Sequence, residues 1–504
     1  AIYAVAILSN FAWTFLFLLY SGRIEWGVNY DIRRMGFRKL QELPFAYYDR
    51  MPVGNLLTRL TSDTAQLGEA LGWGLVDFVW SIFFLTGSLV AMFIMDWRLA
   101  LIAVASLPVL VLISGLFQKR MISNQRKVRR VNSRITAAFN EGIMGSKTTK
   151  TLVREDKNFE EFSQLTGEMH KRSVHASVLS SLLFPIVSLV SSIAVAIVLT
   201  EGAGLVLAGA MSLGSIVAFV GYITDFFHPV QDIAATFAEF QRRQAAAERV
   251  LSLLDTEPGI QDTKEVEAAF GDNFHPRKDQ WPAIHGDIEF QNVHFHYADG
   301  EQVLDSFNLH VQAGQTVALV GPTGAGKSTI VNLLCRFYEP TEGSILIDGV
   351  NYRQRSQLWL QSNLGYVLQE PHLFSGTIRD NIRYARKDAP DEAVRQAARL
   401  VNAESFILKL EKGYDTQVGE GGNRLSTGEK QLISFARAIV HNPRLFVLDE
   451  ATSSVDTETD MMIQHAIERT LAGRTSFIIA HRLSTIRSAD RILVIEDGRI
   501  AEDG

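Results

Sequence analysis

The chain has 504 residues, of which 47% are hydrophobic and 21% charged, and its formal net charge is −6. This composition excludes a disordered or fibrous protein, and the acidic balance argues against a nucleic-acid partner. The length suggests two to four domains. One cysteine, Cys335, excludes an intrachain disulfide framework and is compatible with a reducing compartment.

The first half of the chain contains five apolar segments long enough to cross a bilayer as helices, which takes about 20 residues. They cover roughly residues 1–20, 71–95, 99–117, 178–200 and 204–228. The connections at 21–70 and 118–177 are long and rich in Lys and Arg, whereas those around Asp96 and around Glu201 and Gly202 are short. The positive-inside rule therefore predicts that the long connections lie in the cytoplasm and the short turns lie outside.

The long connections are themselves predicted to be helical. Residues 21–43 and 118–139 keep the helical spacing of apolar positions, so the membrane helices are expected to continue into the cytoplasm. Interruptions at 44–54 and 141–145 predict turning points with short exposed helices. Residue 1 would then lie outside, and the odd number of spans favours a longer natural chain with one more helix at its N-terminus.

Asp77, Asp225 and His228 lie within or at the edge of these apolar segments. Ionisable groups are costly inside a membrane, so such residues are candidates for a substrate pathway. All three lie toward the cytoplasmic ends, where the interface can solvate them. The sequence supports a substrate cavity and an interfacial position equally.

The second half of the chain is typical of a soluble α/β protein. Residues 250–283 mark the change, because a Pro-Gly pair at 258–259 ends the last long helix and a polar, turn-rich stretch follows. We expect a transmembrane domain with cytoplasmic helix extensions over residues 1–254, a linker over 255–283, and a nucleotide-binding domain over 284–504.

Residues 315–329 have the pattern of a phosphate-binding loop. Thr316–Val320 reads as a buried strand, residues 321–328 match G-x-x-x-x-G-K-[ST], and the apolar run 330–334 begins a helix. Glycines let backbone N–H groups close around phosphate oxygens at a helix N-terminus, which favours anions. The predicted nucleotide-binding residues are Gly321, Pro322, Thr323, Gly324, Ala325, Gly326, Lys327, Ser328 and Thr329. Lys327 is expected to reach the β- and γ-phosphates, and Ser328 to hold Mg²⁺.

A second motif, at residues 445–450, places two carboxylates at the end of an apolar strand. Four apolar residues predict a core parallel strand, with Asp449 at its carboxyl end and Glu450 directly after it. Asp449 is expected to orient the Mg²⁺ shell. Glu450 is expected to polarise a water for in-line attack on the γ-phosphate.

Between these motifs, residues 425–431 read Leu-Ser-Thr-Gly-Glu-Lys-Gln and resemble the signature sequence of ATP-binding cassette (ABC) proteins. Over essentially its whole length, the chain is similar to a half-transporter of the ABC exporter family, of the multidrug and lipid exporter type. The resemblance implies a membrane all-α helical domain of the six-helix exporter type, with its first helix missing, followed by an α/β P-loop ABC ATPase domain. It also implies ATP and Mg²⁺ as cofactors.

The resemblance implies roles for further residues. Tyr297 matches the aromatic residue that stacks on adenine, Gln369 matches the glutamine that contacts Mg²⁺ and the attacking water, and His481 matches the switch histidine. The implied catalytic residues are Glu450, His481 and Gln369. The implied metal-binding residues are Ser328, Gln369 and Asp449. Short helices over 46–56 and 141–149 are implied to be the coupling helices between the two domains.

The signature segment sets the expected assembly. Ser426 and Gly428 lie at the start of a predicted helix, and in this family they meet the ATP held by the other subunit, so a dimer is required. This chain has Thr427 where the family usually has glycine, and Glu429 where it usually has glutamine. A tolerated variant in a homodimer is one interpretation. A heterodimer in which one of the two ATP sites is weakened is the other, and we favour it.

The predicted function is ATP-driven export of an amphiphilic drug, lipid or peptide by alternating access. The protein is expected to be a multi-pass protein of the cytoplasmic membrane, with its nucleotide-binding domain in the cytoplasm. An importer and an ATP-gated regulator on the same fold are the alternatives, and the presence of Glu450 and His481 argues against a regulator that does not hydrolyse ATP.

Overall fold

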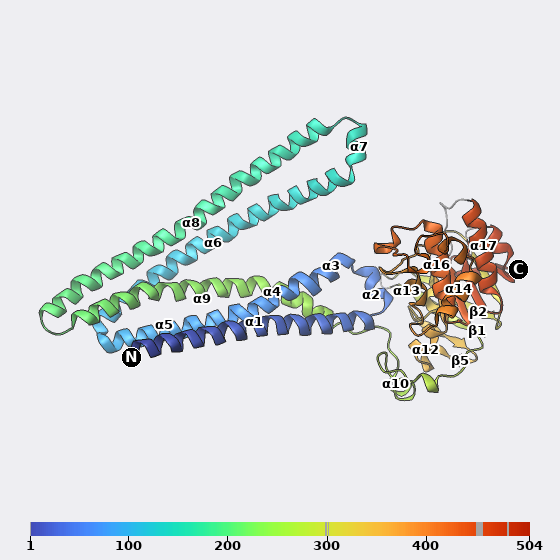
Figure 1. The fold of residues 1–504 in the computed structure, drawn as a ribbon, viewed down its shortest axis with the longest axis horizontal. Coiled ribbons are helices and arrows are strands. Elements are labelled where there is room, and N and C mark those ends of the chain that lie inside the picture. The colour runs from blue at the N-terminus through green and yellow to red at the C-terminus, as the bar shows by residue number, and fades with distance from the viewer. Residues whose placement is uncertain (1, 298–299, 301, 450–456, 481–482) are drawn as a thin grey trace. The chain divides into compact units, whose positions relative to one another are not determined.

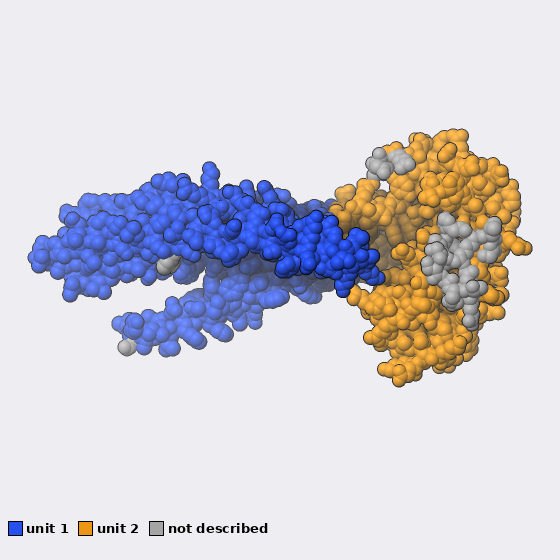
Figure 2. Space-filling view, turned by 90° about the horizontal axis from the view of Figure 1, so that it is seen from above, with its two compact units in different colours: residues 1–37, 54–255 blue, residues 38–53, 256–504 orange. Residues whose placement is uncertain are grey.

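The computed structural model describes residues 2–297, 300, 302–449, 457–480 and 483–504. Two compact units divide the chain, and Figure 2 colours them separately. Unit 1 contains residues 1–37 and 54–255, and unit 2 contains residues 38–53 and 256–504.

Unit 1 consists of long helices (Figure 1). They are α1 (Ile2–Glu42, whose last residues belong to unit 2), α3 (Val53–Thr58), α4 (Thr64–Glu69), α5 (Leu75–Met95), α6 (Trp97–Met144), α7 (Ser146–Thr151), α8 (Glu155–Leu207) and α9 (Leu213–Leu254). The π-helical turns Arg59–Asp63 and Ala70–Gly74 join α3, α4 and α5 into one continuous rod. The helices α6 and α8 run side by side along their length, and α5 packs beside α9.

Four helical stretches of the described chain are long and apolar enough to cross a membrane: Ile2–Glu42, Val53–Met95, Trp97–Met144 and Glu155–Leu207. The fifth expected segment, 204–228, corresponds to a shorter apolar stretch of α9, Leu213–Phe226. Where these helices touch, an apolar cluster that includes Met92, Leu99, Val198 and Phe219 is buried. Four of the five expected membrane helices are therefore confirmed within the described residues, and they extend well beyond their apolar segments, whereas the fifth has a shorter apolar stretch than expected.

One predicted turn is confirmed and one is displaced. Asp96 ends α5, and its carboxylate accepts hydrogen bonds from the backbone N–H groups of Arg98 and Leu99 at the start of α6. The turn expected at residues 201–202 is wrong, because α8 continues to Leu207. The stop comes at Gly209, whose φ of +71° and N–H bond to the carbonyl of Val206 form a Schellman ending.

Unit 2 contains two β-sheets. The antiparallel sheet has the order β2-β1-β4-β5. Its strands are β1 (Ile288–His296), β2 (Gln302–Val311), β4 (Glu342–Ile347) and β5 (Val350–Asn351). The second sheet has the order β10-β9-β3-β8-β7-β6 and is parallel except for β10. Its strands are β3 (Thr316–Val320), β6 (Leu364–Val367), β7 (Leu445–Asp449), β8 (Thr475–Ile479), β9 (Arg491–Glu496) and β10 (Arg499–Asp503).

Helices complete unit 2 around these sheets (Figure 1). They are α2 (Phe45–Arg50), α10 (Lys264–Phe270), α11 (Lys327–Leu334), α12 (Gln357–Ser362), α13 (Ile378–Arg383), α14 (Asp391–Leu400), α15 (Glu404–Ile407), α16 (Thr427–Ile439), α17 (Thr457–Leu471) and α18 (Leu483–Arg487). Strands β3, β7 and β8 are buried along almost their whole length, which explains their continuous apolar runs. The expected α/β domain is thus present.

Candidate functional site

The phosphate-binding loop connects β3 to α11, as the sequence predicts. Gly321 has a φ of +149°, and a Cβ there would lie 2.1 Å from the carbonyl oxygen of Ile495. Gly326, with a φ of +102°, is the N-cap of α11. Both positions favour glycine, because L residues rarely adopt this backbone conformation, and at Gly321 a side chain would also overlap the backbone of Ile495. The loop therefore wraps the N-terminus of α11 and leaves its N–H groups available for an anion.

Lys327 is held inside this loop. Its ammonium donates hydrogen bonds to the carbonyl oxygens of Gly321 and Pro322, each at 2.7 Å, and its side chain is buried. Burial lowers the pKa of Lys327, and the negative charge of Asp449 opposes that shift. The Lys327 ammonium is thus held within the loop, near the carboxylate of Asp449 at the end of β7.

The parallel sheet brings the predicted catalytic segments to one edge. Strands β3, β8, β7 and β6 are neighbours, so their carboxyl ends lie together. Asp449 ends β7, and Gln369 follows two residues after the end of β6. Glu450 and His481 directly follow Asp449 and Ala480 in the chain, and both lie outside the described residues.

The oxygen atoms of the side chains at the carboxyl ends of these strands are suitable ligands for Mg²⁺. Ser328 offers an exposed hydroxyl at the start of α11, Asp449 a carboxylate, and Gln369 an amide oxygen. Mg²⁺ prefers such oxygen ligands and normally completes its shell with water and substrate phosphates. These residues fit a nucleotide-bound Mg²⁺ ion.

Tyr297 lies beside the phosphate loop. Its hydroxyl is 3.1 Å from the hydroxyl oxygen of Thr329, and its ring makes edge contacts with Phe295 and Tyr338 at centroid distances of 4.9 and 5.3 Å. The side chain is half-buried. An aromatic ring held this close to the phosphate loop is well placed to contact a nucleotide base.

The signature segment forms a capping box at the start of α16. The hydroxyl of Ser426 accepts from the N–H of Glu429 at 3.3 Å and donates to the Glu429 carboxylate at 2.9 Å. The same carboxylate accepts from the N–H of Ser426 at 2.8 Å. Gly428 is buried in the first turn. Glu429, one of the two residues that depart from the family pattern, therefore engages both the N–H and the hydroxyl of Ser426.

The sequence missed a contact between α2 and the aromatic residues beside the phosphate loop. In α2, Phe45 stacks on Phe337 at a centroid distance of 4.1 Å, and the Asp49 carboxylate accepts a 2.5 Å hydrogen bond from the hydroxyl of Tyr338. Tyr338 in turn contacts Tyr297. The aromatic pair Phe337 and Tyr338, three and four residues after the helix of the phosphate loop, was the available signal, because aromatic side chains with a polar group are common at contact surfaces.

The chain turns between α1 and α2. α1 ends at Glu42, just before Pro44, and α2 begins at Phe45, which confirms the turning point expected over 44–54.

Asp77 borders a cavity of about 180 Å³ in unit 1, together with Trp73 and Arg243. The side chain of His228 lies outside the described residues.

Comparisons with known proteins agree with this arrangement. Residues 1–230 match the ABC transporter transmembrane region, and residues 304–453 match the ABC transporter nucleotide-binding model. The chain is 34% identical over 495 residues to the uncharacterized ABC transporter ATP-binding protein YknV of Bacillus subtilis, covering 98% of this chain and 80% of that protein. The chain belongs to the ABC transporter family. It is an ATP-hydrolysing membrane transporter of the exporter fold.

Other similar proteins have more specific descriptions. The probable multidrug resistance ABC transporter YheH of Bacillus subtilis is 38% identical over 94% of this chain and 69% of its own length. A fatty acid ABC transporter of Mycobacterium tuberculosis is 38% identical over 92% of this chain and 72% of its own. Among solved structures, a bacterial Atm1-family ABC exporter with ATP bound has a TM-score of 0.79 and 28% identity, covering 100% of this chain and 86% of that one.

Proposed function

We propose that this chain exports an amphiphilic drug, lipid or peptide across the cytoplasmic membrane, as one half of a dimer that alternates between inward-open and outward-open states. The observation that carries the proposal is the glycine-lined phosphate loop with Lys327 held inside it, in a chain whose helices are also long and apolar enough to span a membrane. The names of YheH and of the fatty acid transporter support an apolar or amphiphilic cargo. ATP binding closes the nucleotide-binding domains, and hydrolysis resets them.

Each site residue has a role in this proposal. Tyr297 stacks on adenine, the loop from Gly321 to Thr329 binds the phosphates, and Ser328, Gln369 and Asp449 hold Mg²⁺. Glu450 polarises the attacking water, and His481 contacts the γ-phosphate. Nucleotide-bound Mg²⁺ supplies charge neutralisation on the phosphates, while the chain's own residues orient the nucleotide and the water. The short helices α2 and α7 transmit the motion to the membrane domain.

We further infer that the partner is a different half-transporter. The charge of Glu429 supports this. The usual glutamine can form the same capping box with Ser426, whereas Glu429 adds a negative charge where the partner's γ-phosphate is to bind. An anion at a helix N-terminus competes with a second anion for the same N–H groups and the same dipole. The signature of this chain then forms a weak site, while its phosphate loop and Glu450 form the active one with the partner's signature.

The test uses the full-length protein with its partner, reconstituted in inside-out vesicles with ATP outside. We expect ATP-dependent accumulation of an amphiphilic dye, with trapped nucleotide but no turnover in Glu450→Gln and no nucleotide binding in Lys327→Ala. The exposed Lys412→Ala is the matched control and is expected to behave as the wild type. Wild-type turnover in Glu450→Gln contradicts the assignment of the catalytic base. ATP-driven loss of dye from preloaded inside-out vesicles identifies an importer instead.

A further inference from the structure

A basic cleft lies between α6 and α8 in unit 1. It has a volume of about 210 Å³ and is lined by Asn124 and Lys127 of α6 and by Lys171, Arg172 and His175 of α8. The two helices are joined nearby by an ion pair between Arg134 and Glu168, at 3.2 Å. The cleft is therefore formed by two helices that hold each other in place.

Most of the positive charge in this cleft is not neutralised. Residues 97–140 and 169–200 contain no Asp or Glu at all. Glu168 pairs with Arg172 at 2.9 Å, but within the described residues no carboxylate pairs with Lys127 or Lys171. Two lysines without a described carboxylate partner and one partly engaged arginine thus line this cleft. An anion is the complementary ligand for such a set of donors.

The cleft lies close to the expected membrane surface. The apolar segments of α6 and α8 end at about residues 117 and 178, so at 1.5 Å per residue His175 lies about 5 Å and Lys171 about 10 Å from the hydrocarbon boundary. Lys127 lies about 15 Å away along α6, and its long side chain can extend toward the surface. Lys119 and Arg120 lie directly at the end of the apolar segment of α6. The headgroup layer is about 5–7 Å deep on each side of the bilayer, so His175, Lys119 and Arg120 lie within it. Lys171 and Lys127 lie on its cytoplasmic side and reach it only through their long side chains.

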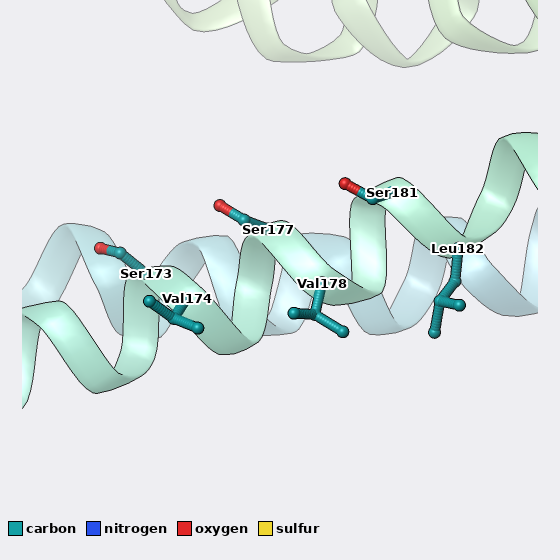
Figure 3. A pocket seen from close by; sticks show the side chains of 6 residues that line it. All are labelled: Ser173, Val174, Ser177, Val178, Ser181 and Leu182. Atoms are coloured by element: carbon teal, nitrogen blue, oxygen red, sulfur yellow. The ribbon is translucent and has the colours of Figure 1, made fainter.

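Next to the cleft, a row of apolar side chains follows α8. Val174, Val178 and Leu182, together with Ser173, Ser177 and Ser181, line an open pocket of about 420 Å³ (Figure 3). Figure 3 shows the serine hydroxyls along one side of the helix and the apolar side chains along another. Helical spacing places Lys171, His175, Val178 and Leu182 on one face of α8. A ligand with a charged headgroup and an apolar chain would therefore contact the basic residues with its headgroup and the apolar residues with its chain.

We propose that the cleft between α6 and α8 binds an anionic phospholipid of the surrounding bilayer as a resident lipid. Its headgroup phosphate accepts hydrogen bonds from Lys127, Lys171 and Arg172, and one acyl chain lies along Val174, Val178 and Leu182. The bilayer supplies anionic phospholipid at high local concentration, and basic residues next to the membrane attract it. The proposal goes beyond the transport function and rests on the proposed topology of the chain.

The test measures lipid binding without ATP, so its outcome does not depend on transport. The full-length protein with its partner is placed in nanodiscs of phosphatidylcholine with a small fraction of photo-crosslinkable phosphatidylglycerol of the same acyl chains. We expect crosslinks on α6 and α8 around the cleft, mapped by mass spectrometry. Lys127→Gln and Lys171→Gln are each expected to reduce crosslinking about fivefold. Basal ATPase activity is expected to be unchanged and shows that the variants fold.

The matched control is Lys147→Gln with Lys150→Gln, two exposed lysines of α7 away from the cleft. Equal losses in this control and in the cleft variants, or wild-type crosslinking in the cleft variants, overturn the proposal. Inorganic phosphate at millimolar concentration is expected not to compete, because it lacks the acyl chain. If the phosphatidylglycerol probe instead crosses the bilayer only with ATP and only with Glu450 intact, it is cargo, and the resident-lipid proposal fails.

Discussion

Arg336 shows how a single buried side chain joins separate segments of unit 2. Its guanidinium, only 2% exposed, pairs with Asp262 at 2.7 Å and with Glu339 at 2.8 Å. It also donates to the carbonyl oxygens of Gln261 and Arg355. The segment before α10 is thereby attached to the second residue after the phosphate-loop helix. Asp262, itself 7% exposed, depends on this one cation among the described ion pairs.

This arrangement predicts a large stability effect. Arg336→Met leaves a buried carboxylate without its cation, so it is expected to destabilise unit 2 by about 3–5 kcal/mol. Arg353→Met is the matched control, because Arg353 pairs with the same Glu339 but is 40% exposed, and it is expected to cost about 1 kcal/mol or less. Thermal unfolding of the full-length protein measures both. Equal shifts of the unfolding temperature in the two variants contradict the assignment.

Among the secondary-structure elements, the short helix α2 is connected to the proposed nucleotide site through a series of side-chain contacts. Its Asp49 contacts Tyr338, Tyr338 contacts Tyr297, and Tyr297 contacts Thr329 of the phosphate loop. Desolvation, together with the adjacent Asp49 charge, raises the pKa of Tyr338, so the phenol stays protonated and keeps donating. The position of α2 and that of the proposed adenine-binding ring are thus linked through two side chains.

We therefore predict that Tyr338→Phe separates coupling from nucleotide binding. The variant keeps the ring contact with Tyr297 but loses the hydrogen bond to Asp49, so the KM for ATP is expected to change less than twofold, while stimulation of ATPase activity by transported substrate falls several-fold. Asp49→Leu is expected to have the same effect, and the double variant no further effect. Additive losses in the double variant contradict a direct link between the two residues.

The displaced turn between α8 and α9 also makes a topological prediction. Ala210 is exposed in that turn, and Ser146 is exposed at the start of α7. In sealed cells, a cysteine at Ala210 is expected to react with an impermeant maleimide, whereas one at Ser146 is expected to react only after permeabilisation. Burial raises the pKa of the native Cys335 thiol, so that residue gives no background. The reverse labelling pattern overturns the proposed orientation.

At the scale of the whole molecule, the two ATP sites of the assembled transporter are predicted to be unequal. Glu450→Gln in this chain is expected to abolish most ATP turnover, while the equivalent change in the partner is expected to have little effect. In the proposed heterodimer, this chain contributes the catalytic carboxylate to the active site but offers the weak site a signature capped by Glu429.

Glu429→Gln with Thr427→Gly tests the same idea from the other side. These changes are expected to increase nucleotide affinity at the weak site several-fold, because a neutral amide no longer repels the γ-phosphate. Total turnover is expected to stay nearly unchanged if the partner lacks a catalytic carboxylate. ATP binding and hydrolysis are measured on the purified complex. A homodimer of this chain alone with substrate-stimulated ATPase activity contradicts the heterodimer proposal.

The sequence by itself determined the order of the two regions, the membrane helices and the phosphate loop. These features are local, because about 20 apolar residues make a span and Gly321, Gly326 and Lys327 lie within a few residues of each other. Asp449 was predictable because a short apolar strand leads directly to it. Glu450 and His481 rest on the sequence and the family alone.

The tertiary structure decided the features that join residues far apart in the chain. The path from Asp49 to Tyr338 spans 289 residues, and the basic cleft needs α6 and α8 side by side, which no periodicity can specify. The end of α8 was missed for a local reason, because Gly202 continues a helix whereas Gly209 adopts the positive φ that ends one. The capping of Ser426 by Glu429 is likewise local, because Ser-x-x-Glu is a sequence pattern of a helix N-terminus, and the structure adds the hydrogen bonds that the pattern makes.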